Sequence, residues 1–293
     1  MRELVVFISA LVLLAGCNGG KEYSPEIDFG GVAYIKVIVQ DDLDSVRMDI
    51  NHSSYYPAQS CLIHRITRPE QVWFQFRDTV YTSYMIPGDT LVARVGLDKA
   101  GDGSSNISFH IDDPIFAFLQ NERREFGCFY TQSPIAITAF NTQPETERQF
   151  KDAVKRIDQA GKERLEFLQK NSNNLPGWFC DFYENEISYF SAHMKFFQYY
   201  YLKDRNLKGI PMPCDVKIYN PEAVSSPIYW RFISDYLLLS DTVDDRLIGS
   251  PRLMAYYSKA SHNINSLLKG KVLEYFNVYL LYDLYYRFYT RRE

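Results

Sequence analysis

The chain has 293 residues, 46% of them hydrophobic, which suffices for one large domain or two ordinary ones with a sizeable apolar core. Its 32 lysines and arginines against 36 aspartates and glutamates give a formal net charge of −4 without a basic stripe, which argues against nucleic acid as a partner. No P-loop, His-Glu-x-x-His or Gly-x-Ser-x-Gly motif occurs, so we assign no catalytic residue, no metal site and no cofactor, and the sequence leans against an enzyme.

Residues 1–16 are typical of a secretion signal. An uninterrupted small and apolar run covers residues 4–16, which is too short to span a bilayer comfortably. The run ends in Leu14-Ala15-Gly16-Cys17, which resembles the lipobox of bacterial lipoprotein signals. The resemblance implies cleavage before Cys17, lipid on its sulfur, and a lipidated tether over 17–25. An ordinary signal peptide with a chance cysteine is the alternative.

Lipid on Cys17 would make a membrane the first partner of this protein. Each buried methylene contributes about 0.8 kcal/mol, so more than one acyl chain, such as palmitate, holds a protein firmly. Asn18 follows the cysteine, and by the same resemblance this favours the outer membrane of the cell envelope. Which leaflet the protein faces stays open.

Four further cysteines follow, and an oxidising envelope permits disulfides among them. They allow three pairings, between which the sequence does not choose, and isolated thiols are the alternative. No Cys-x-x-Cys motif is present, so a thioredoxin-type redox centre is not expected in this chain. The four are Cys61, Cys128, Cys180 and Cys214.

The segment 26–111 has the pattern of a β domain. β-Branched and aromatic stretches alternate with turn signals at regular spacing, which predicts an antiparallel β-sandwich-like domain. The loop at 98–106 faintly resembles a calcium loop, but Phe109 stands where a glutamate is required, so a hairpin loop is favoured. The expected strands are 32–39, 45–50, 61–66, 71–76, 79–86, 91–95 and 106–111.

From residue 112 to 293 the pattern is helical, so the predicted fold class is α+β. Asp113 before Pro114 is typical of a helix start. The helix over 178–202 carries aromatic residues on more than one face and should be largely buried. The other expected helices are 144–168, 229–239, 252–268 and 271–289.

The last predicted helix carries a tyrosine stripe at spacings of four and three. It either packs on the helix over 178–202 as core or forms an exposed face that docks a partner. The residues considered for a partner face are Tyr275, Tyr279, Tyr282 and Tyr286.

Two further hypotheses depend on individual side chains. His193 follows Tyr189 by four positions and Glu186 by seven, so a carboxylate–histidine pair for proton transfer is conceivable, although a buried structural histidine is the commoner case. Carbohydrate binding by the β domain is favoured if Trp73 and Tyr81 are exposed on one face of a sheet.

Four Asp-Ser/Thr-apolar triplets resemble the sites that are O-glycosylated in exported proteins of Bacteroidetes. Two of them also fit ordinary β residues at turn edges. The candidate acceptors are Ser45, Thr79, Thr90 and Thr242.

The mature chain resembles the region that precedes the thioredoxin domain in TlpA-like thiol–disulfide oxidoreductase lipoproteins of Bacteroidetes. The resemblance covers the lipobox, the turn Pro87-Gly88-Asp89-Thr90, the segment 178–189, and shorter stretches at 229–232 and 268–276. In that family a thioredoxin domain comes next, whereas this sequence stops at Glu293 without the Cys-x-x-Cys motif of that domain. The resemblance therefore implies a non-catalytic binding or docking module, or a truncated or partner-dependent member that works with a separate thioredoxin-domain protein.

Overall fold

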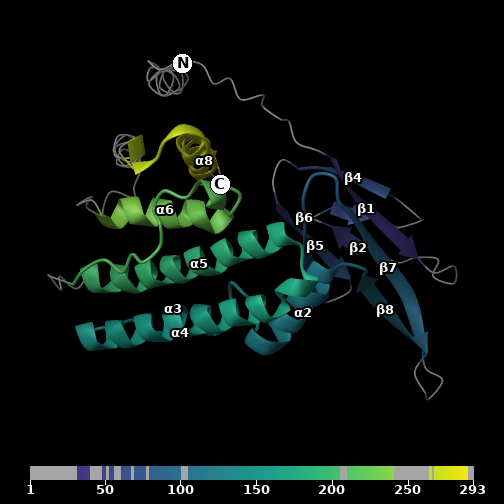
Figure 1. Ribbon diagram of the computed structural model, residues 1–293, viewed down its shortest axis with the longest axis horizontal. Helices are drawn as coiled ribbons and strands as arrows, with labels where there is room; N and C mark the ends of the chain where they lie inside the picture. The colour runs from purple at the N-terminus through teal and green to yellow at the C-terminus, as the bar shows by residue number, and fades with distance from the viewer. Residues whose placement is uncertain are drawn as a thin grey trace.

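The computed structural model confirms the α+β class, with strands in the N-terminal part of the chain and helices in the C-terminal part (Figure 1). The predicted signal, the tether and Cys17 lie outside the described residues. The structure describes residues 32–39, 48–50, 53–55, 61–66, 69–76, 79–99, 105–204, 210–240, 264–265 and 267–289.

The described strands form two four-stranded sheets. One sheet has the order β4 (Cys61–Arg65), β1 (Val32–Val39), β7 (Thr90–Lys99) and β8 (Ser105–Ile111). The other has the order β3 (Ser53–Tyr55), β2 (Met48–Ile50), β5 (Glu70–Phe76) and β6 (Thr79–Met85).

Each predicted strand overlaps an observed one, because alternation between apolar and polar residues marks a half-buried strand. In β1, Ala33, Ile35 and Val37 are buried, whereas Tyr34 and Lys36 between them are exposed. The predicted hairpin after β7 is also present, since β7 and β8 pair antiparallel from Lys99↔Ser105 onward. The short strand β3 escaped prediction.

The expectation of a purely antiparallel arrangement is wrong for one pair of strands. β1 and β7 run parallel, from Tyr34↔Thr90 to Val39↔Val95. Between them the chain passes repeatedly from one sheet to the other before β7 enters beside β1. Alternation along a strand marks its buried face but carries no information on the direction of its neighbour, so the sequence pattern could not reveal this pairing.

The Pro-Gly-Asp-Thr segment is a tight turn that fastens β6 and β7 to β1. Gly88 has φ +94°, a value that suits the third residue of a type II turn after Pro87. The amide of Asp89 donates to the carbonyl of Ile86 at 3.1 Å, and the carboxylate of Asp89 accepts from the Ile86 amide at 2.9 Å. The amide of Tyr34 donates to the carbonyl of Asp89 at 2.8 Å, so the turn also closes against β1.

The helices begin at recognisable caps. α2 (Pro114–Phe126) starts as predicted, with the Asp113 carboxylate accepting from the Phe116 amide at 2.9 Å. The sequence missed α3 (Pro134–Asn141), which is short and is capped by Ser133. The remaining described helices are α4 (Glu147–Asn171), α5 (Gly177–Asp204), α6 (Pro227–Ser240) and α8 (Gly270–Tyr289), with short 3-10 turns at Ser172–Asn174 and Pro221–Ala223.

The predicted helix over 252–268 lies mostly outside the described residues. Helix α5 occupies the centre of the helical part, with α3 and α4 on one side and α6 and then α8 on the other (Figure 1). Aromatic rings fill the contacts between helices: the Tyr189 ring on α5 lies 4.8 Å from the Tyr229 ring on α6, and Phe196 on α5 stacks on Phe232 of α6 at 5.1 Å. Such pairs contribute about 0.5–1.5 kcal/mol beyond the burial of their area. The prediction that the helix over 178–202 is largely buried is therefore confirmed.

Where the sheets and helices meet, each part contributes a side chain to the apolar core of the other. Tyr84 on β6 belongs to the apolar cluster of the helical part, with its ring 5.3 Å from that of Phe182. Phe116 on α2 belongs instead to the cluster of the sheets, with its ring 6.1 Å from that of Tyr81. Each part thus completes the core of the other, and α2 is held against β6.

Candidate functional site: a cleft along helix α5

A cleft of about 760 Å³ opens beside the first half of α5. Its walls come from α5 and from the segment 215–225, and Pro69, just before β5, also lines it. The cleft therefore lies where the strand-rich and helical parts adjoin, a common position for ligand sites.

The α5 wall is a single helix face. Trp178, Asp181, Asn185 and Ser188 line the cleft and follow one another at spacings of three, four and three. At 1.5 Å rise per residue, this face is about 15 Å long. The cleft thus offers a row of groups rather than a single point.

The opposite wall is fixed in place by buried tyrosines. The hydroxyl of Tyr189 donates to the Lys217 carbonyl at 2.8 Å, and that of Tyr229 donates to the Ile218 carbonyl at 2.8 Å. Burial raises the pKa of Tyr229 to about 12 and also raises the pKa of Tyr189, so both hydroxyls stay protonated at neutral pH and remain donors. The wall is therefore preorganised.

An asparagine pair ties the two walls together. The side-chain amide of Asn220 donates to Oδ1 of Asn185 at 3.1 Å. Oδ1 of Asn220 in turn accepts from the Glu222 amide at 3.1 Å, which shapes the turn at this end of the cleft. The Asn220–Asn185 hydrogen bond therefore holds the two walls in contact at this point.

The lining is acidic. Asp215 is neutralised by Lys195, whose buried ammonium lies 2.6 Å from the carboxylate of Asp215 and 2.8 Å from that of Asp158. The lining also contains the carboxylates of Asp181, Glu184 and Glu222, and one cationic side chain, that of Lys217.

Among the described residues, none of these three carboxylates forms an ion pair, and all three residues are exposed. Their field reaches the neighbouring thiol of Cys180, whose pKa is raised first by burial and then by the charge of Asp181. The cleft can therefore accept hydrogen bonds and attract positive charge. Its described lining contains neither histidine nor cysteine.

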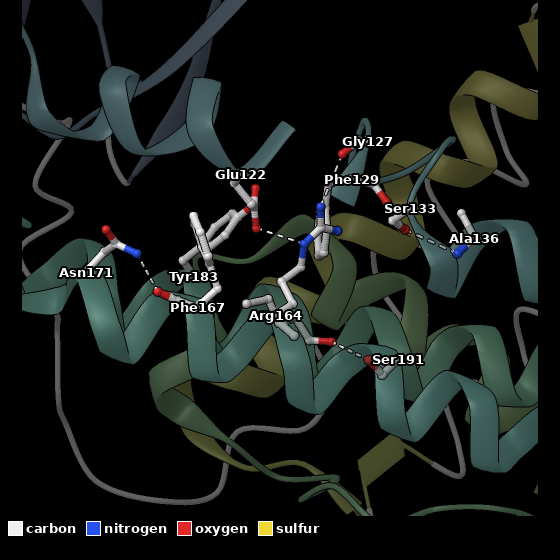
Figure 2. A network of polar contacts seen from close by, with 11 residues as sticks. Glu122, Gly127, Phe129, Ser133, Ala136, Arg164, Phe167, Asn171, Tyr183 and Ser191 are labelled. Atoms are coloured by element: carbon white, nitrogen blue, oxygen red, sulfur yellow. Dashed lines mark hydrogen bonds and ion pairs between the residues drawn. The ribbon is translucent and has the colours of Figure 1, made fainter. Parts of the chain in front are cut away.

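A buried ion pair joins Glu122 of α2 to Arg164 of α4 (Figure 2). Nε of Arg164 is 2.8 Å from Oε1 of Glu122, and the two side chains are 1% and 4% exposed. Tyr183 donates its hydroxyl to the other oxygen of Glu122 at 2.6 Å. Nη2 of Arg164 donates to the Gly127 carbonyl at 3.2 Å, and the guanidinium lies 4.5 Å from the ring centre of Phe129.

A second buried carboxylate, that of Glu186, has a different environment. Tyr130 and Ser226 donate their hydroxyls to its two oxygens, and the Ile228 amide also bonds to it. Tyr84 from β6 bonds to Tyr130. Burial raises the pKa of Glu186, and these donors act against that rise. These hydrogen bonds link β6, the loop at Tyr130, α5 and α6, so we assign Glu186 a structural role.

The predicted pairing of His193 with Glu186 and Tyr189 does not form. Nδ1 of His193 contacts the carboxylate of Asp235 on α6 instead. The carboxylate and hydroxyl that share its helix point elsewhere, because Glu186 bonds to Ser226 and Tyr189 bonds to the loop. Spacing within α5 could not reveal a partner on another helix.

The predicted modification and partner sites are only partly described. Ser45 and Thr242 lie outside the described residues, Thr79 opens β6, and Thr90 is exposed immediately after the turn. Tyr275 is 52% exposed, whereas Tyr279 packs with Phe276 at 5.9 Å. Of the other two stripe residues only the backbone, in α8, is described: Tyr282 and Tyr286.

The condition set for carbohydrate binding by the sheet is not met. Tyr81 pairs with the buried Phe74, whereas Trp73 pairs with Thr82. Directly opposed residues share a face, and neighbours along a strand alternate, so Trp73 and Tyr81 point to opposite faces. Tyr81 also packs against the ring of Phe109 at 4.6 Å.

Three of the four candidate disulfide cysteines carry free thiols: Cys128, Cys180 and Cys214. The side chain of Cys61 lies outside the described residues. Within the described residues, no three or more histidine, cysteine, aspartate or glutamate side chains lie close enough together to hold a metal ion.

Comparison with known proteins gives no match, whether to a family model, to a curated protein or to a solved structure. Among the described helices, none has the length and apolarity required to cross a bilayer.

Sequence reasoning missed the cleft and the buried ion pair. For the ion pair a signal existed: Glu122 follows Leu119 by three and Ile115 by seven, and Arg164 follows Ile157 by seven, so helical spacing places both charges on buried faces. For the cleft, spacing marks the wall on α5, but nothing in the sequence brings the segment 215–225 opposite to it.

Proposed function

We propose that this protein is a lipid-anchored lipoprotein of the cell envelope, sited at the outer membrane, that acts as a non-catalytic binding module. The observation that carries the binding role is the preorganised open cleft, because its lining offers carboxylates, side-chain amides and hydroxyls that can bind a ligand. The anchoring role rests on the apolar segment that ends at Cys17. The proposal includes a relation between this chain and the region upstream of the thioredoxin domain in TlpA-like lipoproteins, which rests on the sequence resemblance alone.

The β part fits this proposal as a sandwich. Buried residues of β1 and β7 from one sheet and of β5 from the other share a single apolar cluster, as sheets packed face to face would. The segment between Cys17 and Val32 spans at most roughly 50 Å when fully extended, so lipid on the cysteine would keep the body and its cleft close to the membrane.

Anchoring is tested by metabolic labelling with radioactive palmitate followed by membrane fractionation. We expect the wild-type chain to be labelled and to sediment with membranes, and the Cys17→Ser variant to lose both properties. Cys128→Ser is the matched control, since it removes a free thiol from the folded body and should leave labelling unchanged. An unlabelled wild-type chain, or a Cys17→Ser variant that stays membrane-embedded, removes the anchoring proposal.

A partner-dependent role in thiol–disulfide exchange is the second candidate. It is favoured by the exposure of Tyr275 and Val278 on α8, at 52% and 63%, which leaves apolar groups available to a partner such as a separate thioredoxin-domain protein. Pull-down with a thioredoxin-domain protein of the same envelope should then weaken in Tyr275→Ser while the unfolding midpoint is unchanged. Retention of full binding by that variant contradicts this docking face.

A further inference from the structure

The cleft has the dimensions of a short extended chain. The α5 face from Trp178 to Ser188 is about 15 Å long, which matches four or five extended residues at roughly 3.3 Å each. Residues of the segment 215–225 line the cleft from the other side, and the Asn220–Asn185 hydrogen bond joins the two walls within this length. An elongated occupant would meet both walls, whereas a compact one would use only part of them.

Charge decides the chemical class of that occupant. After Lys195 has neutralised Asp215, the lining keeps three carboxylates, on Asp181, Glu184 and Glu222, against the single ammonium of Lys217. An anionic occupant would be repelled. A neutral one would leave the carboxylates without partners of opposite charge.

An aromatic surface stands at one end of this acidic row. Trp178 is half-buried, with its ring held edge-on against Phe179 at 5.8 Å. A lysine or arginine group over an indole ring gains about 0.5–1 kcal/mol at an exposed site. Along α5, Trp178, Asp181 and Glu184 follow one another at spacings of three. An indole and two carboxylates in this row suit a chain that carries cationic side chains at intervals.

We propose that the cleft binds an extended basic segment of a partner protein, with its lysine or arginine side chains at Asp181, Glu184 and Glu222 and one cation against Trp178. This inference rests on the proposed binding function, for which it names the ligand class. The rigid walls favour binding because little ordering of the protein has to accompany it.

Fluorescence anisotropy of a labelled Lys-Ala-Lys-Ala-Lys peptide, titrated with the full-length chain in nonionic detergent, tests the proposal. We expect saturable binding that weakens with added salt, and about tenfold weaker binding to the Asp181→Asn/Glu184→Gln variant, which corresponds to about 1.4 kcal/mol. Trp178→Leu should weaken binding about threefold.

The matched control is Asp152→Asn/Glu163→Gln, which removes the same two charges from exposed positions on α4, away from the cleft lining. Its affinity should stay within about twofold of the wild type. An equal loss in the control shows attraction by net charge alone and overturns the proposal. Because all four side chains are exposed, both variants should unfold at the wild-type urea midpoint.

A peptide with glutamine in place of each lysine separates the ligand class from the binding function. If it binds as well as the basic peptide and is weakened by Trp178→Leu, the cleft is a binding site but the basic class is wrong. If neither peptide binds, the ligand assignment fails. Membrane labelling at Cys17, measured separately, then still decides whether the chain is an anchored lipoprotein.

Discussion

Among the described residues of the helical part, the buried glutamates Glu122 and Glu186 are accommodated in opposite ways. Glu122 faces the guanidinium of Arg164 and one tyrosine hydroxyl, whereas Glu186 is surrounded by the hydroxyls of Tyr130 and Ser226 and a backbone amide. Burial raises the pKa of both carboxyls. The charge of Arg164 opposes this rise by lowering the pKa of Glu122, whereas the pKa of Glu186 is lowered only by hydrogen bonds.

The difference matters for what each site can tolerate. A buried ion pair contributes little net stability, because desolvation offsets the attraction, but removal of one partner leaves an uncompensated charge. A buried carboxylate with neutral donors can instead become protonated and so escape that cost. The ion pair should therefore be fragile toward substitution, and the hydroxyl-bonded site should be sensitive to pH.

Arg164→Met should give the largest effect. It removes the only ion-pair partner that the structure shows for Glu122, while its apolar chain still fills the space beside Phe129. We expect a loss of about 3–5 kcal/mol in the free energy of unfolding, measured by urea denaturation at neutral pH. The double variant Glu122→Gln/Arg164→Met is the control and should recover much of that loss. A double variant as unstable as the single one contradicts the ion-pair account.

The tyrosines that donate to the two carboxylates allow a finer comparison. Tyr130→Phe removes one of the few donors to Glu186, and we expect it to cost about 2 kcal/mol, the magnitude of a hydrogen bond to a charged group. Tyr183→Phe removes a donor from Glu122, which keeps Arg164, so its cost should be about 1 kcal/mol.

Urea denaturation of both tyrosine variants, beside Tyr219→Phe at an exposed position, measures this difference. The Tyr219→Phe control should lie within about 0.5 kcal/mol of the wild type. A larger loss from Tyr183→Phe than from Tyr130→Phe would reverse the comparison and show that Arg164 does not support Glu122 as described.

Much of the fold follows from local patterns. Alternation in β1 places Ala33, Ile35 and Val37 inside, and a capping carboxylate before Pro114 starts α2, so these elements were visible in the sequence. The parallel pairing of β1 with β7 was not visible, because it depends on how the chain crosses between sheets. Helix α3 was missed because its eight residues are too few to show a clear period.

The candidate site was visible only on one side. Asp181 and Glu184 are two of several charged residues on an aromatic-rich helix, and helical spacing places Asp181 one turn from Trp178. The second wall depends on two tyrosine hydroxyls. That of Tyr189 bonds to the carbonyl of Lys217, 28 positions later in the chain, and that of Tyr229 bonds to the carbonyl of Ile218, 11 positions earlier. Long-range hydrogen bonds of this kind leave no periodic signal, so neither the cleft nor its residues were predicted as a site from the sequence.

The smallest predicted effect concerns pH at Glu186. In the unfolded chain its carboxyl should titrate near an ordinary value of about 4.3, whereas burial raises its pKa in the folded protein. Between these two values the folded state holds more protons than the unfolded state, so stability falls as pH rises. Below the lower value both states are protonated, and the contribution of this group is fully present.

The Glu186→Gln variant cannot titrate at this position and should lack that component. We therefore expect the stability advantage of the wild type over Glu186→Gln to shrink as pH rises from about 4 through the raised pKa, with a slope of at most about 1.4 kcal/mol per pH unit. Urea denaturation of both proteins across this range measures the difference, and other titrating groups cancel because they are common to both. Glu163→Gln, exposed on α4, should show no such trend. An advantage that grows with pH would mean that folding favours the charged carboxylate, so that the hydroxyl donors outweigh burial and the contrast with Glu122 disappears.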